Sequence, residues 1–484
     1  MLKKLSLFSF AAVLLVCAGM TLAWGAPAAT TALVVPAATA AAAEHPGKAF
    51  IEQNGYEGPK TCENCHPGKA AEFLTTVHWR HRSPAHTVTA GVDPKKEYGM
   101  YNRVYSFCNG NDIVNKLKET PVGTHTKKTT LSGCNTCHPG NNIYGPESTG
   151  KEAEASIDCL VCHSSTYDYA KRKPYKDEQG RVVMGQDRTK EAALSAGKPG
   201  VKNCMACHEK AGGGSLIKRG FDFRPETDVH AANKMVCVDC HKGKNHHIPT
   251  GLDPNNWASD SNERISCLNC HDAKPHKKNK HLAEDYNRHG DRIYCTACHI
   301  PYTGGAYSKD FTKWELLPNK WFEPTTLEKG PKETVPDYAW FNGKTINSPT
   351  YVGPAGDRND KTSKIYSFKI YHGKIFLNKK TGEPMAMDFA DPKATGDVKA
   401  GVASAAKQLG IKDYELVPTW QTLFFANSHL VTKRGALTCE KCHSEVGVLD
   451  FGRLGYTAKE ITQLRSPSNY FDKYAAIKAE ENEE

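Results

Sequence analysis

The sequence predicts a mainly α-helical fold with extensive irregular loops and one short β-hairpin, in which bound groups supply much of the core. Three observations lead to this fold class. Only 39% of the 484 residues are hydrophobic, which is little for a core of this size. Sixteen of the 18 cysteines fall into one repeated motif. The first cysteines of two neighbouring motifs lie as few as 25 residues apart, so a separate domain around each motif is excluded.

The repeated motif is C-x-x-C-H, which is typical of covalent haem attachment. Two thiols three positions apart add to the two vinyl groups of one haem, and the adjacent histidine binds the iron. Thioredoxin-like redox sites and zinc sites predict one or two such motifs in a cytosolic chain, whereas this chain has eight. The sequence therefore predicts eight covalently attached c-type haems, which stack into a conducting core. The motifs are Cys62/Cys65/His66, Cys134/Cys137/His138, Cys159/Cys162/His163, Cys204/Cys207/His208, Cys237/Cys240/His241, Cys267/Cys270/His271, Cys295/Cys298/His299 and Cys439/Cys442/His443.

Residues 1–25 have the features of a secretory signal peptide. Two lysines precede an apolar run, Leu5 to Val16, that is too short to span a bilayer. Residues 26–48 are rich in Ala, Pro and Thr and predict a flexible leader. We therefore expect an exported, periplasmic protein with no transmembrane anchor after cleavage of the signal.

The formal net charge of +10 does not indicate a nucleic-acid partner. Each ferric haem carries about one net negative charge, because two propionates outweigh the single positive charge of the iron-porphyrin. Eight haems contribute about −8, which nearly cancels the +8 left when Lys3 and Lys4 are removed with the signal peptide. The basic side chains are therefore interpreted as a counter-charge for the predicted cofactors.

Thirteen histidines lie outside the motifs, and they are the candidates for the sixth iron ligands. Only 8 methionines are present, so histidine is the expected distal ligand and low-potential bis-histidine haems follow. One ligand is expected from each of the pairs His246/His247 and His276/His281, and His247 and His276 are the residues chosen. The other chosen ligands are His78, His230, His289, His372 and His429.

The remaining histidines, His45, His81, His86 and His125, are expected to be exposed or to support a ligand without binding iron. The seven chosen histidines serve seven haems. One haem is therefore left without a histidine as its sixth ligand.

Seven segments around the motifs are much more specific than C-x-x-C-H itself. They are TCENCHPGKAAEFLTTVHW (61–79), SFCNG (106–110), SIDCLVCHSSTYDYAKR (156–172), GKPGVKNCMACHEKAGGG (197–214), DVHAANKMVCVDCH (228–241), NRHGDRIYCTACHIP (287–301) and LTCEKCHSEVGVLDFGRLGY (437–456). In these segments the chain resembles the octahaem tetrathionate reductase family, relatives of hydroxylamine oxidoreductase. The resemblance covers Pro59 to Tyr456, most of the chain.

The resemblance implies seven bis-histidine haems and one active haem, the second along the chain. This active haem has a lysine as its distal ligand and a free cysteine nearby. Carried onto this sequence, it is the haem of Cys134, Cys137 and His138, the free cysteine is Cys108, and the lysine is Lys198. Lys171 and Lys173 remain alternatives for the lysine. The count of histidines, which leaves one haem without a histidine, agrees with this interpretation.

The implied activity is reduction of a small sulfur or nitrogen oxyanion, such as tetrathionate, nitrite or hydroxylamine, at the lysine-ligated haem. A partner cytochrome or a quinol-linked donor would supply the electrons, and self-association is left open. The absence of a C-x-x-C-K motif argues against nitrite reductases that attach their catalytic haem in that way. The alternative is a pure electron-transfer cytochrome in which all eight haems are bis-histidine.

The motif density divides the mature chain into three parts. Residues 49–300 carry the first seven motifs, residues 301–457 form a haem-poor subdomain with the eighth, and residues 458–484 predict a helical tail. In the haem-poor part, KIYSFKIYHGKIFLN (Lys364–Asn378) alternates apolar and polar residues on both sides of Tyr-His-Gly. This pattern predicts the short β-hairpin, with His372 at its turn.

Overall fold

The computed structural model describes residues 45–98, 137–141, 149–176, 178–179, 182–209, 223–255, 259–260, 262–278, 280–304, 307–318, 322–329, 333–388, 390–432 and 435–466. The predicted signal peptide, nearly all of the leader and residues 467–484 of the predicted tail lie outside these ranges. So do the candidate site residues Cys108, His125 and Cys134. In the described ranges, no helix is long and apolar enough to cross a membrane.

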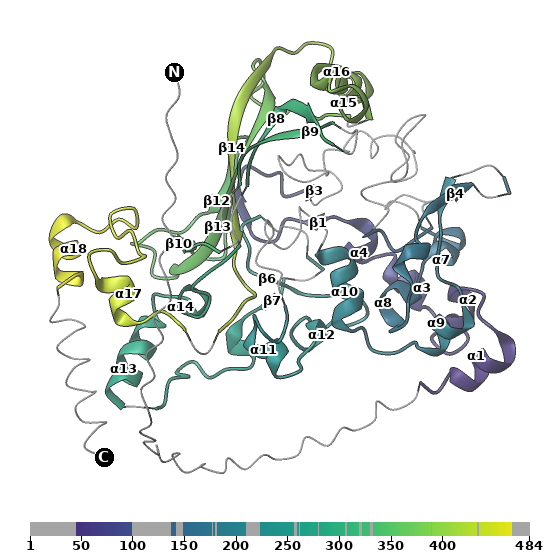
Figure 1. Ribbon diagram of the computed structural model, residues 1–484, viewed down its shortest axis with the longest axis horizontal. Helices are drawn as coiled ribbons and strands as arrows, with labels where there is room; N and C mark the ends of the chain where they lie inside the picture. The colour runs from purple at the N-terminus through teal and green to yellow at the C-terminus, as the bar shows by residue number, and fades with distance from the viewer. Residues whose placement is uncertain are drawn as a thin grey trace, which may run out of the picture. The chain divides into compact units, whose positions relative to one another are not determined.

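Residues 48–300 fold into short helices joined by loops, and most motifs begin or occupy a helical turn (Figure 1). A helical turn places residues i, i+3 and i+4 on one face, so the two thiols and the histidine of a motif project from the same side. These helices have four to ten residues. They are α1 (Lys48–Asn54), α2 (Pro59–Glu63), α3 (Lys69–Phe73), α4 (Val77–Arg80), α7 (Lys151–Ser156), α8 (Leu160–His163), α9 (Lys190–Leu194), α10 (Val201–His208), α11 (Val229–Ala232), α12 (Cys237–Cys240), α13 (Lys280–His289) and α14 (Cys295–His299), with 3-10 turns at Tyr169–Lys171 and Cys267–Asn269.

Side-chain caps start two helices that carry expected iron ligands. Thr76 accepts a hydrogen bond from the Trp79 backbone N–H at 3.4 Å and caps α4, which contains His78. Asp228 accepts a hydrogen bond from the His230 N–H at 2.8 Å and caps α11. Such caps satisfy donors that a helix of one turn leaves unpaired, so they fix the backbone next to each ligand.

Residues 307–426 form most of an eight-stranded mixed sheet, so the prediction of a mainly α fold is wrong for this part of the chain. The strands run in the order β2-β11-β12-β14-β13-β8-β9, with β10 paired to β13. Three neighbouring pairs are parallel, β2 with β11, β12 with β14, and β8 with β13. The strands are β2 (Val88–Ala90), β8 (Tyr307–Leu316), β9 (Phe322–Lys329), β10 (Asp337–Phe341), β11 (Thr345–Asn347), β12 (Tyr351–Pro354), β13 (Lys364–Asn378) and β14 (Leu416–Ala426).

The predicted hairpin is also wrong, because Lys364–Asn378 is one continuous strand, β13. Its Tyr371-His372-Gly373 step does not turn but pairs with Leu423, Thr422 and Gln421 of β14. Nearly every side chain of β13 is buried, on both faces. A central strand that is covered on both sides loses the simple alternation of apolar and polar residues, which explains why its pattern was compatible with two shorter strands.

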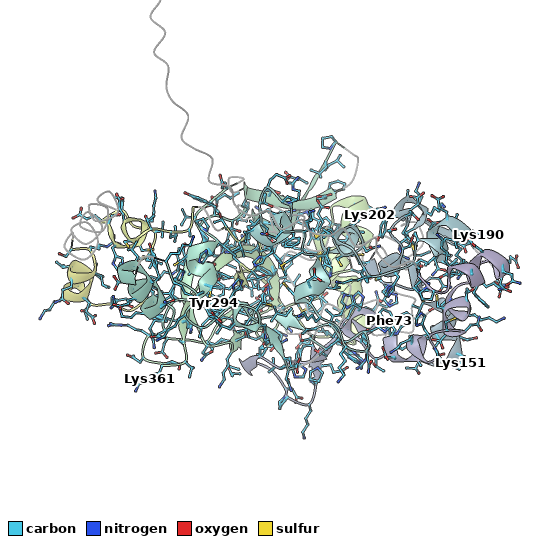
Figure 2. The ribbon with its side chains drawn as sticks, turned by 90° about the horizontal axis from the view of Figure 1, so that it is seen from below. Phe73, Lys151, Lys190, Lys202, Tyr294 and Lys361 are labelled. Carbon is cyan, nitrogen blue, oxygen red and sulfur yellow. The ribbon has the colours of Figure 1, made fainter. Side chains whose placement is uncertain are left out.

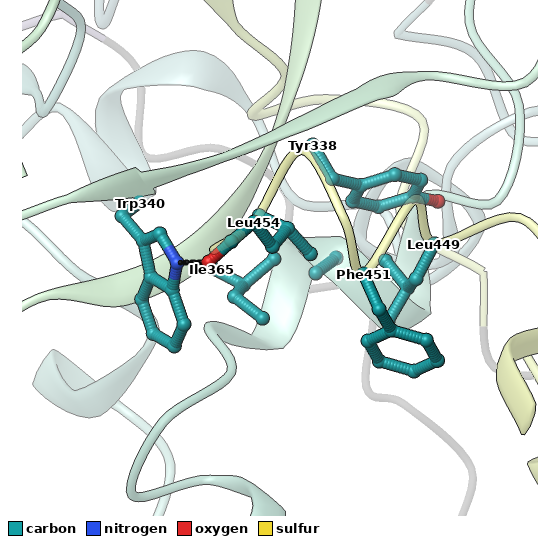
Figure 3. Packing of buried hydrophobic residues seen from close by; sticks show 7 residues of the cluster. Tyr338, Trp340, Ile365, Leu449, Phe451 and Leu454 are labelled. Carbon is teal, nitrogen blue, oxygen red and sulfur yellow. Dashed lines mark hydrogen bonds between the residues drawn. The ribbon is translucent and has the colours of Figure 1, made fainter. Parts of the chain in front are cut away.

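Hydrophobic clusters cover the sheet at two places. Helices α15 (Ala390–Thr395) and α16 (Val398–Leu409) pack at one end, where Val402 of α16 lies against Phe376 of β13 (Figure 1). At the other place, Trp340 and Ile365 pack with Leu454, and Trp340 Nε1 donates a hydrogen bond to the Leu454 carbonyl at 2.8 Å (Figure 3). The chain around α17 (Cys439–His443) and α18 (Ala458–Leu464) is thereby fixed to the sheet.

Three small two-stranded sheets stabilise loops between the helices. β1 (Ser83–Pro84) pairs with β3 (Glu97–Tyr98), β4 (Pro174–Lys176) with β5 (Val182–Met184), and β6 (Thr250–Gly251) with β7 (Arg264–Ile265). The β1–β3 pair leads into β2 and so connects the helical part to the large sheet.

Candidate haem sites

Cysteines from different motifs lie close enough for their sulfur atoms to interact. Hydrogen bonds or electrostatic contacts between cysteines connect the first motif to the third, and each motif from the third onward to the next. These seven motifs therefore form one continuous row. The contacts are Cys62–Cys159, Cys162–Cys204, Cys204–Cys237, Cys240–Cys270, Cys267–Cys295 and Cys298–Cys439.

The second cysteines of the first and fourth motifs, Cys65 and Cys207, are not among the contacts that define this row. This differs from the prediction, which treated all sixteen motif cysteines alike as haem ligands. Cys65 is exposed, because it lies in the turn that follows α2, where its N–H donates to the Cys62 carbonyl oxygen at 3.1 Å. Cys207 is half-buried on α10 and interacts electrostatically with Tyr169 and Arg172. Haem attachment at these two thiols therefore stays a prediction from the motif spacing.

Each motif histidine in this row faces a histidine from elsewhere in the chain. The ring centres of the seven pairs are 6.0 to 6.5 Å apart. The partners come from helices and loops far away in the sequence as well as from nearby turns. The pairs are His66–His45, His163–His246, His208–His78, His241–His429, His271–His230, His299–His276 and His443–His289.

The spacing of these pairs fits a metal ion between the two rings. An imidazole nitrogen binds a metal at about 2.0–2.1 Å, so two imidazoles on opposite sides of one iron have ring centres roughly 6 Å apart. All seven distances fall in a range of half an ångström around this value. The residues present therefore fit a row of haems with two axial histidines each.

Hydrogen bonds hold the motif histidines with the correct nitrogen available for iron. A carbonyl oxygen can only accept, so a ring nitrogen bonded to it must carry the hydrogen. Nδ1 is this donor in four motif histidines, which leaves the lone pair of Nε2 free to bind a metal. The four bonds are His163 to Gly197 O at 2.9 Å, His241 to Pro249 O at 2.9 Å, His299 to Thr432 O at 3.0 Å and His443 to Leu464 O at 2.7 Å.

Three of the partner histidines have side-chain acceptors at Nδ1. Two acceptors are carboxylates, Asp228 at 3.1 Å from His230 and Glu72 at 2.7 Å from His246. The third is the amide oxygen of Asn287, at 3.3 Å from His276. A carboxylate on Nδ1 makes an imidazole a stronger donor to a metal than a neutral amide does. Phe73, labelled in Figure 2, packs edge-on against the His246 ring at 5.6 Å and completes that site.

The second motif differs from the other seven. The ring of His138 is fully buried, and its nearest ring neighbours are Trp79 at 4.6 Å and His81 at 5.4 Å. Its Nε2 lies 3.2 Å from the Trp79 carbonyl oxygen, and its Nδ1 is buried without a hydrogen-bond partner. Burial, together with the adjacent His81 and Arg172, holds the pKa of His138 well below its usual range. Neutral imidazole is the form that binds a metal.

A buried ion pair supports the second motif. Arg172 and Asp158 both have side chains that are 3% exposed and contact each other at 3.0 Å. Arg172 Nη2 also donates to the His138 carbonyl oxygen at 2.7 Å, and the Tyr167 hydroxyl donates to Asp158. Asp158 directly precedes Cys159, so this network connects the second motif to the third.

Five of the seven predicted distal histidines face a motif histidine, namely His78, His230, His276, His289 and His429. The choice of His247 is corrected to His246, because His247 Nδ1 contacts Asp260 at 3.4 Å and its Nε2 contacts Thr75. His372 is likewise not placed at a motif. It is exposed on β13, where its Nδ1 contacts Thr422 Oγ1 at 3.1 Å.

His45 is the distal partner that sequence reasoning missed. The composition of residues 26–48 suggested a leader, which placed His45 outside the folded part of the chain. The structure has α1 beginning at Lys48 and puts the His45 ring beside His66. A position shortly before a motif, which also holds for His230 and His289, is the signal in the sequence that could have identified it.

Lys198 is not at the second motif, because its ammonium group forms an ion pair with Asp239 at 2.7 Å and its side chain is 64% exposed. Of the two alternatives, Lys171 pairs with Asp187 at 2.7 Å, and Lys173 is exposed. In the part of the chain that the structure describes, the buried lysine is Lys369 on β13. Burial lowers the pKa of its ammonium group to about 7.

Three comparisons with known proteins were informative. Residues 328–446, which include β13, β14 and the eighth motif, match the family described as Cytochrome c bacterial. An uncharacterized protein from Archaeoglobus fulgidus is 30% identical over 226 residues, which are 40% of this chain and 76% of that protein. The crystal structure of octaheme cytochrome c from Shewanella oneidensis has the same fold, with a TM-score of 0.59 and 22% identity, covering 88% of this chain and 96% of that chain.

Proposed function

We propose, from the premise that this chain is a multihaem c-type cytochrome of one family with the Archaeoglobus fulgidus protein, that it is a periplasmic octahaem reductase. Electrons enter from a redox partner and pass along the row of seven bis-histidine haems. A small sulfur or nitrogen oxyanion is reduced at the second haem. When bound, the haems supply one-electron redox chemistry and, where the sixth position is not held by histidine, a site for a substrate atom.

The observation that carries this proposal is the exception at His138. Seven motif histidines face a second histidine at 6.0 to 6.5 Å, which suits electron transfer because both axial positions are filled. His138 instead has an indole at 4.6 Å and a histidine ring at 5.4 Å, closer than two axial ligands of one iron would be. A site that departs from seven otherwise similar sites is the best candidate for a separate chemical role.

The residues around His138 suit a site that must hold charge away from water. Arg172 and Asp158 neutralise each other in the interior, so neither is an isolated buried charge. Arg172 fixes the His138 backbone through its carbonyl oxygen. Truncating Arg172 would leave Asp158 buried without a cation, so Arg172 has a structural role in addition to its electrostatic one.

For the lysine that the family resemblance implies, Lys369 is a better candidate than Lys198. A lysine binds a metal only as the neutral amine, and burial makes this form accessible near neutral pH. Lys369 lies on the same face of β13 as Tyr371, which packs with Val88 and Tyr98. These residues belong to the segment that follows His81, the neighbour of His138.

The alternative function is pure electron transfer with all haems bis-histidine. The observation that favours it is the ring of His81, at 5.4 Å from His138 and tilted by 34°. Only a small outward shift of this ring is needed to reach the spacing of the other seven pairs. His81 has a positive φ of 53°, a conformation that is uncommon for a residue other than glycine.

Electron paramagnetic resonance (EPR) of the oxidised protein separates the two functions. The reductase predicts seven bis-histidine haems and one haem with a different sixth ligand, whereas pure electron transfer predicts eight bis-histidine signals. In Lys369→Ala we expect one haem to become high-spin, with Lys198→Ala as the matched control that leaves the spectrum unchanged. An unchanged spectrum in Lys369→Ala combined with loss of one low-spin signal in His81→Ala would establish the alternative.

Stopped-flow mixing of the reduced protein with tetrathionate, nitrite or hydroxylamine tests the reaction itself. Tetrathionate takes up two electrons and divides into two thiosulfate ions, so product analysis identifies the chemistry. We expect at least one of these compounds to reoxidise the haems faster in the wild type than in Lys369→Ala. Equal rates in both proteins for all three compounds would contradict the reductase proposal.

A further inference from the structure

Two buried aspartates each contact two segments that carry distal histidines. The side chain of Asp228 is 1% exposed and that of Asp260 is 3% exposed. Neither is part of a motif, and neither contacts a lysine or arginine side chain in the ion pairs of the described residues. Their hydrogen bonds go to backbone N–H groups and to histidines, which is an unusual use for a buried carboxylate.

Asp228 joins the distal histidines of the fifth and sixth motifs. Its Oδ1 accepts hydrogen bonds from the backbone N–H of His230 at 2.8 Å and from the ring Nδ1 at 3.1 Å. Its Oδ2 accepts from the Val431 N–H at 2.9 Å, two residues after His429. The His230 ring faces His271 of the sixth motif, and the His429 ring faces His241 of the fifth.

Asp260 does the same for the third and fourth motifs. Its Oδ1 accepts a hydrogen bond from the Val77 N–H at 2.6 Å, directly before His78. Its Oδ2 accepts from the Ile248 N–H at 3.1 Å, two residues after His246. The His78 ring faces His208 of the fourth motif, and the His246 ring faces His163 of the third.

We propose that Asp228 and Asp260 are positioning residues, each of which sets the distal ligation and the reduction potential of two haems at once. The inference rests on the proposed haem ligation. Asp260 acts on the third and fourth haems, and Asp228 on the fifth and sixth. In both cases the two haems are neighbours in the row, as the contacts Cys162–Cys204 and Cys240–Cys270 show.

Two physical effects give the carboxylates this role. A charge-assisted hydrogen bond to a backbone N–H holds the chain next to each ligand more firmly than a neutral acceptor does. A fixed negative charge in a poorly polarisable interior also favours the oxidised, more positive iron. Both haems that share one aspartate should therefore have lower potentials than they would beside a neutral side chain.

The test is an EPR-monitored redox titration of the holoprotein carrying Asp260→Asn or Asp228→Asn. Asparagine keeps the size of the side chain, removes its charge and turns one acceptor into a donor that opposes a backbone N–H. In each variant we expect two haems to shift together, each by about tenfold or more in its one-electron equilibrium, which is 59 mV. The other haems should stay within the error of the titration.

Two control variants make the expected pairwise shift specific. Glu72 contacts the ring of a single distal histidine, so Glu72→Gln should move one haem only. Asp310 is equally buried but bonds to Thr312 on the sheet, so Asp310→Asn should move none. A shift of one haem or of none in both Asp260→Asn and Asp228→Asn would overturn the inference.

Further measurements keep this result distinct from the proposed function. The wild-type EPR spectrum is recorded first, because fewer than seven bis-histidine haems would contradict the proposed ligation itself. Haem content is determined by mass for each variant. If the asparagine variants do not retain all haems, Asp260→Glu and Asp228→Glu replace them, and each should still change the EPR signals of two haems. A change confined to one haem would again overturn the inference.

Discussion

Residues 49–300 and residues 307–426 are stabilised by different means. In the first part, helices of four to ten residues surround motif histidines and their partners, and apolar clusters such as that of Leu160 and Tyr167 are small. In the second, the 15-residue strand β13 is buried along nearly its whole length and forms the centre of an ordinary hydrophobic core. The comparison teaches that bound haem and apolar side chains replace each other as the material of the interior.

Preventing haem attachment should have the largest effect on this contrast. Helices of this length are unstable in isolation, so we expect residues 49–300 to lose most of their protection against hydrogen exchange in the haem-free chain. β13 and β14 should keep slower exchange, because their partners are other strands. Hydrogen exchange with mass spectrometry on the haem-free and haem-bound protein measures both parts at once. Equal protection of the two parts in the haem-free chain would show that the contrast is wrong.

Phe368→Ala should have a large effect on the sheet and a small one on the haems. The Phe368 side chain is fully buried against Phe341 and Phe424, and its removal is expected to cost about 3–5 kcal/mol in the free energy of unfolding. Trp420 on β14 is 48% exposed, so Trp420→Ala is the control, with an effect below about 1 kcal/mol. Denaturation followed by circular dichroism gives the loss, and the haem absorption spectrum without denaturant should not change.

The pair His246→Ala and His247→Ala tests a single site in the haem-dense part. His246 faces His163, so its removal should convert one haem from low-spin to high-spin. His247 contacts Asp260 and Thr75, so its removal should leave every haem low-spin. Resonance Raman spectroscopy distinguishes these states. The opposite result would restore His247 as the ligand.

Acid should produce the smallest of these effects, through Asp187. Although burial opposes it, hydrogen bonds from Lys171, Asp168 and Thr189 lower the pKa of Asp187 to about 2. The unfolded pKa is about 3.9, so the folded state gains stability that is complete above this value and is lost as the pH falls to about 2. We expect a loss on the order of 1 to 2 kcal/mol in this window. Unfolding free energies measured from pH 5 to pH 2 should show a smaller decline in Asp187→Asn.

The haem sites could be predicted from sequence where local chemistry decides the outcome. The two thiols and the histidine of a motif need only one turn of chain, so their spacing is visible directly. His230 and His289 are close to the next motif, and each of these predicted ligands faces a motif histidine in the structure. These features depend on few residues and do not require knowledge of the tertiary fold.

The prediction failed where the path of a loop decides between neighbours. Asn245 and His246 have positive φ values of 52° and 58°. This turn directs the His246 ring to His163 and Glu72, and the His247 ring to Asp260. A left-handed backbone at two consecutive positions depends on the surrounding structure and is not encoded in the residue types alone. The choice between these two histidines was therefore beyond reach.

The large sheet was missed for a different reason. Its central strand β13 is covered on both faces and lacks the alternation by which a strand is recognised. Much of its pairing is also non-local, such as β2 with β11 and β8 with β13. The haem-poor part was expected to form a subdomain of its own, but the order of its apolar residues along the chain did not reveal the topology.

The pairing of His241 with His429 has a consequence for how the protein is made. During export the motif of His241 is delivered and can receive its haem long before His429 has left the translocation channel. The fifth haem must therefore pass through a stage in which its iron lacks the native distal ligand. His246 and His247 follow the motif within a few residues and compete for the iron at this stage. Release from such a misligated state, rather than formation of helices or strands, is expected to limit the rate at which the mature protein appears.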